Sequence, residues 1–406
     1  MVFFVISFLT NIIGPLIPEI IDDFELSLTL VAVLPFAFFI AYGVMSIPAG
    51  LLIEKYQEKP VMVAAFAVAF AGSSILALVP NYLTAVASLF LIGSGMAMLQ
   101  VAINPLLREA GGEGHYAFNA TLAQLIFGAA SFLSPLVYSY LVLNLQDRSA
   151  GANPLIATLA LVVPEDIPWV SLYWLFAVIA LLMIGVVALS RIPKVERTAE
   201  ERVGALATHV ALLKNPTVIL FFLGIFTYVG LEQGVANWVS EFLSTYHGDD
   251  PQTTGARAVA WFWGLMTLGG VAGIVLLKLL DSRLVLIAFT VAAIISLTAA
   301  LFLSGPVARI AFPLVGFFAA VMYPIIFSLA LNSVEEHHGS FSGILVSAII
   351  GGAVVPLIVG GLGDAFGLRN GMLFLYVPLG YILGTGFWAK PLITNVTITR
   401  RSAEAV

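Results

Sequence analysis

Long apolar segments repeat along the whole chain, and short polar stretches or breaks containing Pro, Gly or Asn separate them. An α-helix needs about 20 apolar residues to cross the hydrocarbon core of a bilayer, so each segment of this length predicts a transmembrane helix. The chain contains twelve such segments: 2–21, 28–53, 61–78, 83–107, 118–143, 169–189, 218–243, 258–280, 284–303, 310–331, 341–362 and 372–388. The pattern predicts an all-α membrane protein.

The composition leaves little room for a soluble domain. Of the 406 residues, 60% are hydrophobic and 10% are charged, whereas soluble domains have about 25% charged residues. Twelve spans take up roughly 240 to 300 residues, which leaves about 100 for loops and tails. The composition therefore disfavours an enzyme with a large aqueous catalytic domain, a receptor with an ectodomain and a nucleic-acid reader. Cysteine is absent, which excludes disulfides and thiolate chemistry.

The distribution of Lys and Arg predicts the orientation of the chain. If the N-terminus is cytoplasmic, the loops and tail on that side hold 13 of the 17 basic residues. The opposite loops hold Arg148, Arg257, Arg309 and Arg369. Positive residues concentrate on the cytoplasmic side of membrane proteins. We therefore expect a multi-pass protein of the cell inner membrane with both termini in the cytoplasm.

The two halves of the chain share a proline pattern. Pro105 and Pro135 recur as Pro324 and Pro356, which lie 219 and 221 residues further along the chain. Duplicated halves of this kind face each other across a cavity at the membrane midplane. We expect two pseudo-symmetric six-helix bundles, over residues 1–190 and 216–393. A cytoplasmic linker, 191–215, joins them, and a cytoplasmic tail, 394–406, follows the second bundle.

Glu232 is the acid that the pattern places at mid-depth of a predicted helix. Nearly all of the 23 Asp and Glu residues fall in loops or at helix ends. A carboxylate in the hydrocarbon region costs at least a few kcal/mol, so an intramembrane acid is a candidate functional residue by default. Gln233 and Asn237 share a helix face, and Trp238 lies beside them. Glu232 either binds substrate or the coupling cation, or it is a protonated packing residue.

Amides and aromatic residues supply the other candidate contacts for a substrate. Asn11, Gln100, Asn104 and Gln124 lie inside predicted helices. The candidate aromatic residues are Trp238, Trp261, Trp263, Tyr42 and Tyr323. Amides bind hydroxyls and aromatic faces cover the C–H side of a sugar, so this set suits a neutral polyol better than an anion. Each amide could instead join helices to one another through a hydrogen bond.

Two hairpins contain charged residues that could form a gate on the cytoplasmic side. The first hairpin includes Gly50, Glu54, Lys55 and Lys59, and the corresponding hairpin of the second half includes Asp281 and Arg283. Acids, bases and glycine in these positions could hold the halves together. The alternative is a pair of ordinary charged turns of the positive-inside kind.

Several motifs resemble those of the fucose:proton symporter family of the major facilitator superfamily. The resemblance runs from the first to the eleventh predicted helix. Its motifs are Ile47-Pro48-Ala49-Gly50, Ala102-Ile103-Asn104-Pro105, Leu122-Ala123-Gln124, Tyr228-Val229-Gly230, Tyr323-Pro324-Ile325-Ile326-Phe327-Ser328-Leu329, and Ile349-Ile350-Gly351-Gly352 with Pro356. The resemblance implies a twelve-helix carrier of fucose, glucose, galactose or a related sugar.

The chain departs from that family at the acidic positions that serve its fucose carriers. The family's aspartate of helix one and glutamate of helix four match Gly14 and Gln100, and a sugar-contacting asparagine matches Phe127. Proton coupling through the two acidic positions is therefore impossible here. Coupling has moved to Glu232, or it is absent, or Glu232 and nearby carbonyls hold Na⁺.

The sequence thus predicts an alternating-access transporter of a small neutral solute, most simply a monosaccharide, that works as a monomer in the lipid bilayer. It needs no cofactor beyond a coupling H⁺ or Na⁺ and binds no nucleic acid. Proton-driven efflux of amphipathic or cationic compounds and a non-transporting nutrient sensor remain alternatives. An enzyme is not expected, because paired acids, histidines and nucleophiles are lacking at mid-depth.

Overall fold

The structure is a computed structural model that describes residues 1–406 except 112–115, 147–152, 193–210, 335–337 and 391–406. Side chains at 54, 104–105, 107–121 and 338–340 also lie outside the description. The described part contains twelve helical stretches that are long and apolar enough to cross a membrane. This finding confirms the predicted number of spans.

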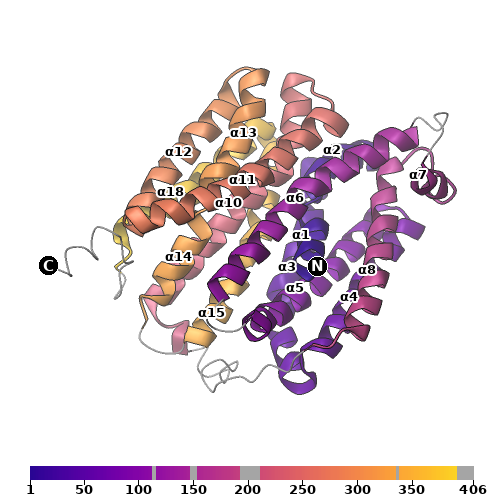
Figure 1. Ribbon diagram of the computed structural model, residues 1–406. Coiled ribbons are helices and arrows are strands. Elements are labelled where there is room, and N and C mark those ends of the chain that lie inside the picture. Colours follow the sequence, from indigo (N-terminus) through magenta and orange to yellow (C-terminus); the bar gives the residue numbers. More distant parts are fainter. Residues whose placement is uncertain (112–115, 147–152, 193–210, 335–337, 391–406) are drawn as a thin grey trace.

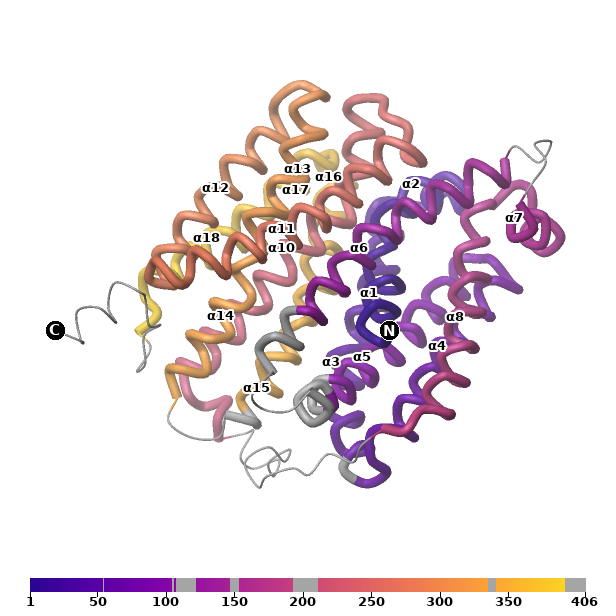
Figure 2. Tube along the Cα trace, viewed as in Figure 1, coloured from indigo at the N-terminus to yellow at the C-terminus, as the bar shows by residue number. Residues whose placement is uncertain are grey.

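The helices of the first six spans are α1 (Val2–Thr10), α2 (Ile13–Phe24), α3 (Leu28–Tyr56), α4 (Glu58–Leu78), α5 (Tyr82–Gly111), α6 (Tyr116–Gln146), α7 (Pro154–Leu159), η2 (Pro168–Val170) and α8 (Ser171–Leu189). The last six comprise α10 (Pro216–His247), η3 (Pro251–Gly255), α11 (Ala256–Leu279), α12 (Ser282–Phe302), α13 (Gly305–Ala319), α14 (Met322–Leu331), α15 (His338–Ser347), η4 (Ala348–Ile350), α16 (Gly351–Phe366), α17 (Leu368–Met372), η5 (Leu373–Leu375) and α18 (Tyr376–Trp388). The elements of each half lie together, and the two halves stand side by side (Figures 1 and 2).

Each span crosses once, so the two ends of the molecule can be told apart by connectivity. We call the end where the chain passes from α8 to α10 the linker end, and the opposite end the far end. The predicted bundle boundaries, 1–190 and 216–393, remain predictions. Most of the predicted linker, 191–215, and all of the predicted tail, 394–406, lie outside the described residues.

Three spans are interrupted near the middle, and proline explains two of the interruptions. The first span breaks at Asn11 and Ile12, between α1 and α2. Pro15 follows four residues after Asn11 and has no N–H to bond the carbonyl of that residue. Pro324 acts in the same way on the carbonyl of Ala320, between α13 and α14. The eleventh span passes through η4 before a Gly-Gly pair.

Small residues allow the two halves to approach closely. Gly14 on α2 lies against the backbone of Ala236 on α10, and a methyl group at Gly14 would lie 3.1 Å from the carbonyl carbon of Ala236. Gly360 on α16 packs against α3, where a methyl group would lie 2.6 Å from the carbonyl oxygen of Leu28. Close backbone contact at small residues is the usual way in which membrane helices associate.

Candidate substrate cavity

A cavity of about 800 Å³ lies between the two halves. Its walls come from α1, α3, α5 and α6 of the first half and from α10, α11, α14 and η4 of the second. The lining reaches from Asn11 at mid-span to Asn332, which follows the linker end of α14. The cavity therefore extends from the middle of the molecule toward the linker end.

The far end is closed by contacts between the halves. Asp364 at the end of α16 accepts hydrogen bonds of 2.8 Å from the backbone amides of Leu28 and Thr29 on α3. The Gln252 side chain of η3 donates to Glu19 of α2 at 2.9 Å. Together with the cavity that extends to the linker end, these contacts define a conformation closed at the far end.

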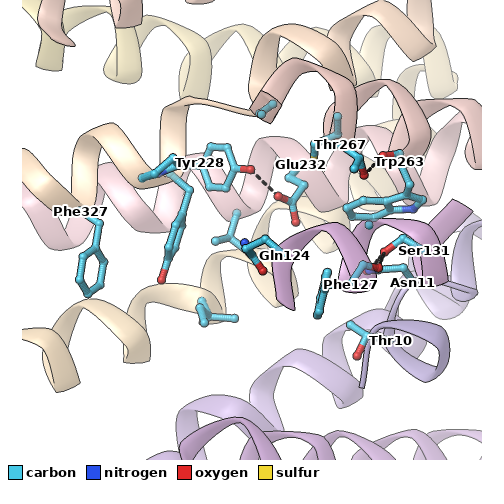
Figure 3. A pocket seen from close by; sticks show the side chains of 18 of the residues that line it. Thr10, Asn11, Gln124, Phe127, Ser131, Tyr228, Glu232, Trp263, Thr267 and Phe327 are labelled. Carbon is cyan, nitrogen blue, oxygen red and sulfur yellow. Dashed lines mark hydrogen bonds between the residues drawn. The ribbon is translucent and has the colours of Figure 1, made fainter. Parts of the chain in front are cut away.

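Glu232 borders the cavity from α10, as Figure 3 shows. Tyr228, one turn earlier, donates its hydroxyl to one carboxylate oxygen at 2.5 Å. The amide of Gln233 donates to the other oxygen at 3.1 Å. Of the lining residues that the structure describes, only Glu232 carries a formal charge. Two donors on one carboxylate fix its position beside the cavity.

An aromatic row continues along the wall of the second half. The rings of Tyr228 and Tyr323 lie 5.7 Å apart, and the ring of Phe327 is stacked 5.7 Å beyond that of Tyr323. Trp263 of α11 also borders the cavity. Flat apolar surfaces therefore lie next to Glu232.

The first half contributes amides and hydroxyls. Asn11 ends α1 and donates its side-chain amide to the hydroxyl of Ser131 on α6 at 2.8 Å. The Ser131 hydroxyl also bonds with that of Ser7 at 2.5 Å, so α1 and α6 share one polar network. Gln100 and Gln124 line the same cavity from α5 and α6. These side chains can donate to and accept from a polyhydroxyl solute.

Six of the predicted contact residues thus come together at one cavity: Asn11, Gln100, Gln124, Glu232, Gln233 and Tyr323. Tyr42 and Trp263, two of the candidate aromatic residues, border it as well. Asn104 lies on α5, but its side chain is outside the described residues.

Three predicted residues lie elsewhere. Trp238 is completely buried and donates its indole N–H to the carbonyl of Pro356 on α16 at 3.2 Å. Asn237 is buried where α10 crosses α2, against Gly14. Trp261 is 51% exposed and packs edge-on against Phe132 of α6. Trp238 and Asn237 lie at helix contacts in this conformation because their side of α10 faces α16 and α2.

The predicted gate residues make contacts within one half in this conformation. Lys59 donates to the carbonyl of Ser190 at 2.9 Å, and Arg283 bonds with Asp281 at 3.4 Å. Lys55 is exposed and lies over the Tyr56 ring. Gly50 is buried near the end of α3, and the side chain of Glu54 is outside the description. A role for these residues in joining the halves therefore stays a prediction for another conformation.

The structure explains why Gly14 replaces the aspartate found in the fucose carriers of the family that this chain resembles. Gly14 lies at the tight α2–α10 crossing, where a side chain would meet the Ala236 backbone. Phe127, the residue at the family's asparagine position, borders the cavity, and its carbonyl accepts a hydrogen bond from the Ser7 hydroxyl at 2.5 Å.

Several residues that line the cavity were not predicted from the sequence as substrate contacts. Tyr228 lies one helical turn before Glu232, and Ser131 lies four residues after Phe127. Spacing of i and i+4 on one helix face was the available signal for both. Thr10 and Thr267 have no comparable signal, because hydroxyls within a membrane helix commonly bond the carbonyl one turn earlier. Both of these threonines do so here, at 2.7 and 3.0 Å.

Comparisons with known proteins agree with this architecture. Residues 1–356 match the family described as the Major Facilitator Superfamily. The chain is 31% identical over 391 residues to the glucose/galactose transporter of Brucella abortus, covering 94% of this chain and 90% of that protein. It is 26% identical over 383 residues to the L-fucose-proton symporter of Escherichia coli, covering 90% and 86%. A crystal structure of the Escherichia coli fucose:proton symporter, 22% identical, superimposes with a TM-score of 0.67 over 96% of both chains. This chain therefore belongs to the Major Facilitator Superfamily, a family of multi-pass membrane transporters and not of enzymes.

Proposed function

We propose that this protein is a secondary active transporter that moves a monosaccharide by alternating access and couples its movement to H⁺ through Glu232. The observation that carries the proposal is a cavity between the halves whose described lining combines neutral amides and aromatic faces with one acid, Glu232. The names of the glucose/galactose and fucose-proton relatives support the same substrate class.

The lining favours a neutral, hydroxyl-rich solute. Asn11, Gln100, Gln124 and Gln233 offer donors and acceptors, while Tyr323 offers an apolar ring face. The described lining includes no Lys or Arg that could pair with a phosphate or carboxylate. An anionic substrate would also meet the charge of Glu232 in a medium of low dielectric constant, which is unfavourable.

Glu232 is the proposed coupling residue because it is the one carboxylic acid among the described lining residues and already accepts hydrogen bonds from two donors. Loading it with a proton removes a charge from the cavity before the halves close around the solute. One positive charge moved with each sugar across 100 mV contributes about 2.3 kcal/mol, or approximately fifty-fold accumulation. Na⁺ in place of H⁺ would give the same electrical contribution.

The proposed orientation places the linker end in the cytoplasm, following the distribution of Lys and Arg. The conformation described above is then closed to the outside and open toward the cytoplasm. In the opposite conformation, the hairpins with Lys55, Lys59, Asp281 and Arg283 would close the cytoplasmic end. We propose that one chain suffices, since the cavity is built from the two halves of a single chain.

The test is uptake of labelled glucose, galactose and fucose into proteoliposomes with imposed proton or sodium gradients. Glu232→Gln should abolish the response of uptake to the gradient while sugar exchange at equal concentrations continues. Glu241→Gln is the matched control, because Glu241 lies on the same helix, bonds with Thr245 and does not border the described cavity.

Gradient-driven uptake by Glu232→Gln that equals the uptake by the unmodified protein would refute the coupling role. Transport of lipophilic cations without sugar transport would instead establish efflux of amphipathic compounds, and sugar binding without flux would establish a sensor.

A further inference from the structure

The N-terminus of α3 is capped from the other half of the molecule. The carboxylate of Asp364, at the far end of α16, accepts hydrogen bonds from the amides of Leu28 and Thr29, each at 2.8 Å. The Thr29 hydroxyl donates to the same carboxylate at 2.5 Å. We call these three bonds the far-end contact. It joins residues that are 335 and 336 positions apart in the chain.

The far-end contact completes a helix cap that local sequence leaves incomplete. The first four amides of an α-helix have no partner within the helix. Ser27 precedes α3 and accepts from the amide of Leu30 at 3.3 Å, which leaves the first two amides for Asp364. A carboxylate at this position also interacts favourably with the positive end of the helix dipole.

The start of the corresponding helical region in the second half is capped differently. Asp250 precedes η3 and accepts from the amide of Gln252 at 3.0 Å and from the hydroxyl of Thr253 at 2.7 Å. These bonds lie within one half, so they remain when the halves move relative to each other. The bonds of Asp364 cross between the halves and must break when the far end opens.

We infer that Asp364 is a positioning residue of the transport cycle, which stabilises the far-end-closed conformation by capping α3 from the opposite half. Hydrogen bonds to an ionised acceptor are stronger than neutral ones. In the far-end-open conformation, the amides of Leu28 and Thr29 and the carboxylate of Asp364 face water instead. The contact therefore favours one conformation and contributes little to the stability of either half.

Asp364 is not the only link at the far end. Gln252 donates to Glu19 across the halves, and Gly14 and Gly360 pack at helix crossings. Loss of the far-end contact should consequently shift the distribution between conformations and should not lock the transporter. The inference depends on alternating access and does not depend on which sugar or cation is carried.

The test uses a single reporter cysteine, which is possible because the chain has no cysteine of its own. Asn237 is buried at the α2–α10 crossing, on the far side of Glu232 along α10. Asn237→Cys should react with a membrane-impermeant maleimide added at the far face only when the far end opens. In this background, we expect Asp364→Ala to raise the ratio of far-end-open to far-end-closed molecules about tenfold, equivalent to about 1.4 kcal/mol. The labelling rate should rise in proportion to the far-end-open population. Asp364→Asn and Thr29→Val should give smaller increases, because each keeps part of the contact.

A second reporter separates a conformational shift from unfolding. Ser328→Cys lines the cavity on the linker side and should be labelled more slowly from that side when Asp364 is replaced. The matched control is Asn81→Ala. Asn81 caps the far end of α5 by accepting a hydrogen bond from the amide of Thr84 at 3.0 Å, and this cap lies within the first half. This control should leave both labelling rates unchanged.

The inference is overturned if Asp364→Ala labels like the parent, or if both reporters label faster, which would indicate loosening of the whole fold. Labelling is measured without sugar, so a failed transport proposal would not alter this result.

Discussion

Gly14→Ala tests whether the α2–α10 crossing controls closure of the far end. A methyl group at position 14 would lie 3.1 Å from the carbonyl carbon of Ala236 and 3.3 Å from the Cα of Asn237, with the Ala236 carbonyl oxygen nearer still. Both of those atoms are backbone, so no side-chain rotation can relieve the contact. The helices must separate by roughly 1 Å to restore van der Waals distance.

The cost of this overpacking falls on one conformation. Inserting a methylene into a packed contact costs about 1 to 3 kcal/mol, and every 1.4 kcal/mol changes a ratio tenfold. Gly14→Ala should therefore shift the distribution away from the far-end-closed conformation by about 5- to 140-fold. A twentyfold shift would reduce a population of about 90% to about 30%. Uptake should slow, because the transporter must close its far end in each cycle.

The assay is labelling of Ser328→Cys from the linker side, with thermal unfolding measured in parallel. The matched control is Gly93→Ala, where a methyl group would lie 3.0 Å from the carbonyl carbon of Phe38. That contact joins α5 to α3 within the first half, so it should lower the unfolding temperature without changing accessibility. The reasoning fails if Gly14→Ala leaves labelling of Ser328→Cys unchanged, or if Gly93→Ala reduces it equally.

Two further substitutions address the cavity itself. Tyr228→Phe removes one of the two donors to Glu232, and a hydrogen bond to an ionised group contributes about 1.5 to 3 kcal/mol. The substitution should reduce gradient-driven uptake by about tenfold or more while sugar exchange persists. Equal losses of both activities would contradict a role in coupling. Ser131→Ala removes the acceptor of the Asn11 side-chain amide, so that this side chain is no longer held in place. The KM for sugar should rise about fivefold, which corresponds to one neutral hydrogen bond of about 1 kcal/mol, with little change in the maximal rate. An unchanged KM would show that Asn11 does not contact the sugar.

The sequence was sufficient for the twelve spans, because the thickness of the bilayer sets the length of each apolar segment. The predicted segment 28–53 lies inside α3 (Leu28–Tyr56), and the segment 284–303 nearly coincides with α12 (Ser282–Phe302). Glu232 was also identifiable, since burial of an acid in an apolar helix is costly wherever the helix packs. Tyr228, which donates a hydrogen bond to Glu232, lies one helical turn earlier on the same face, a spacing that the sequence shows.

Only the tertiary structure decided which face of each helix meets the cavity. Gln233 and Asn237 share a helix face, yet the first borders the cavity and the second packs against α2. Apolar side chains suit lipid and protein interior equally, so the hydrophobic pattern of a membrane helix does not identify its neighbours. For the same reason, the contact between Asp364 and α3 has no signature in either segment, because it depends on how two halves of the chain meet at the far end.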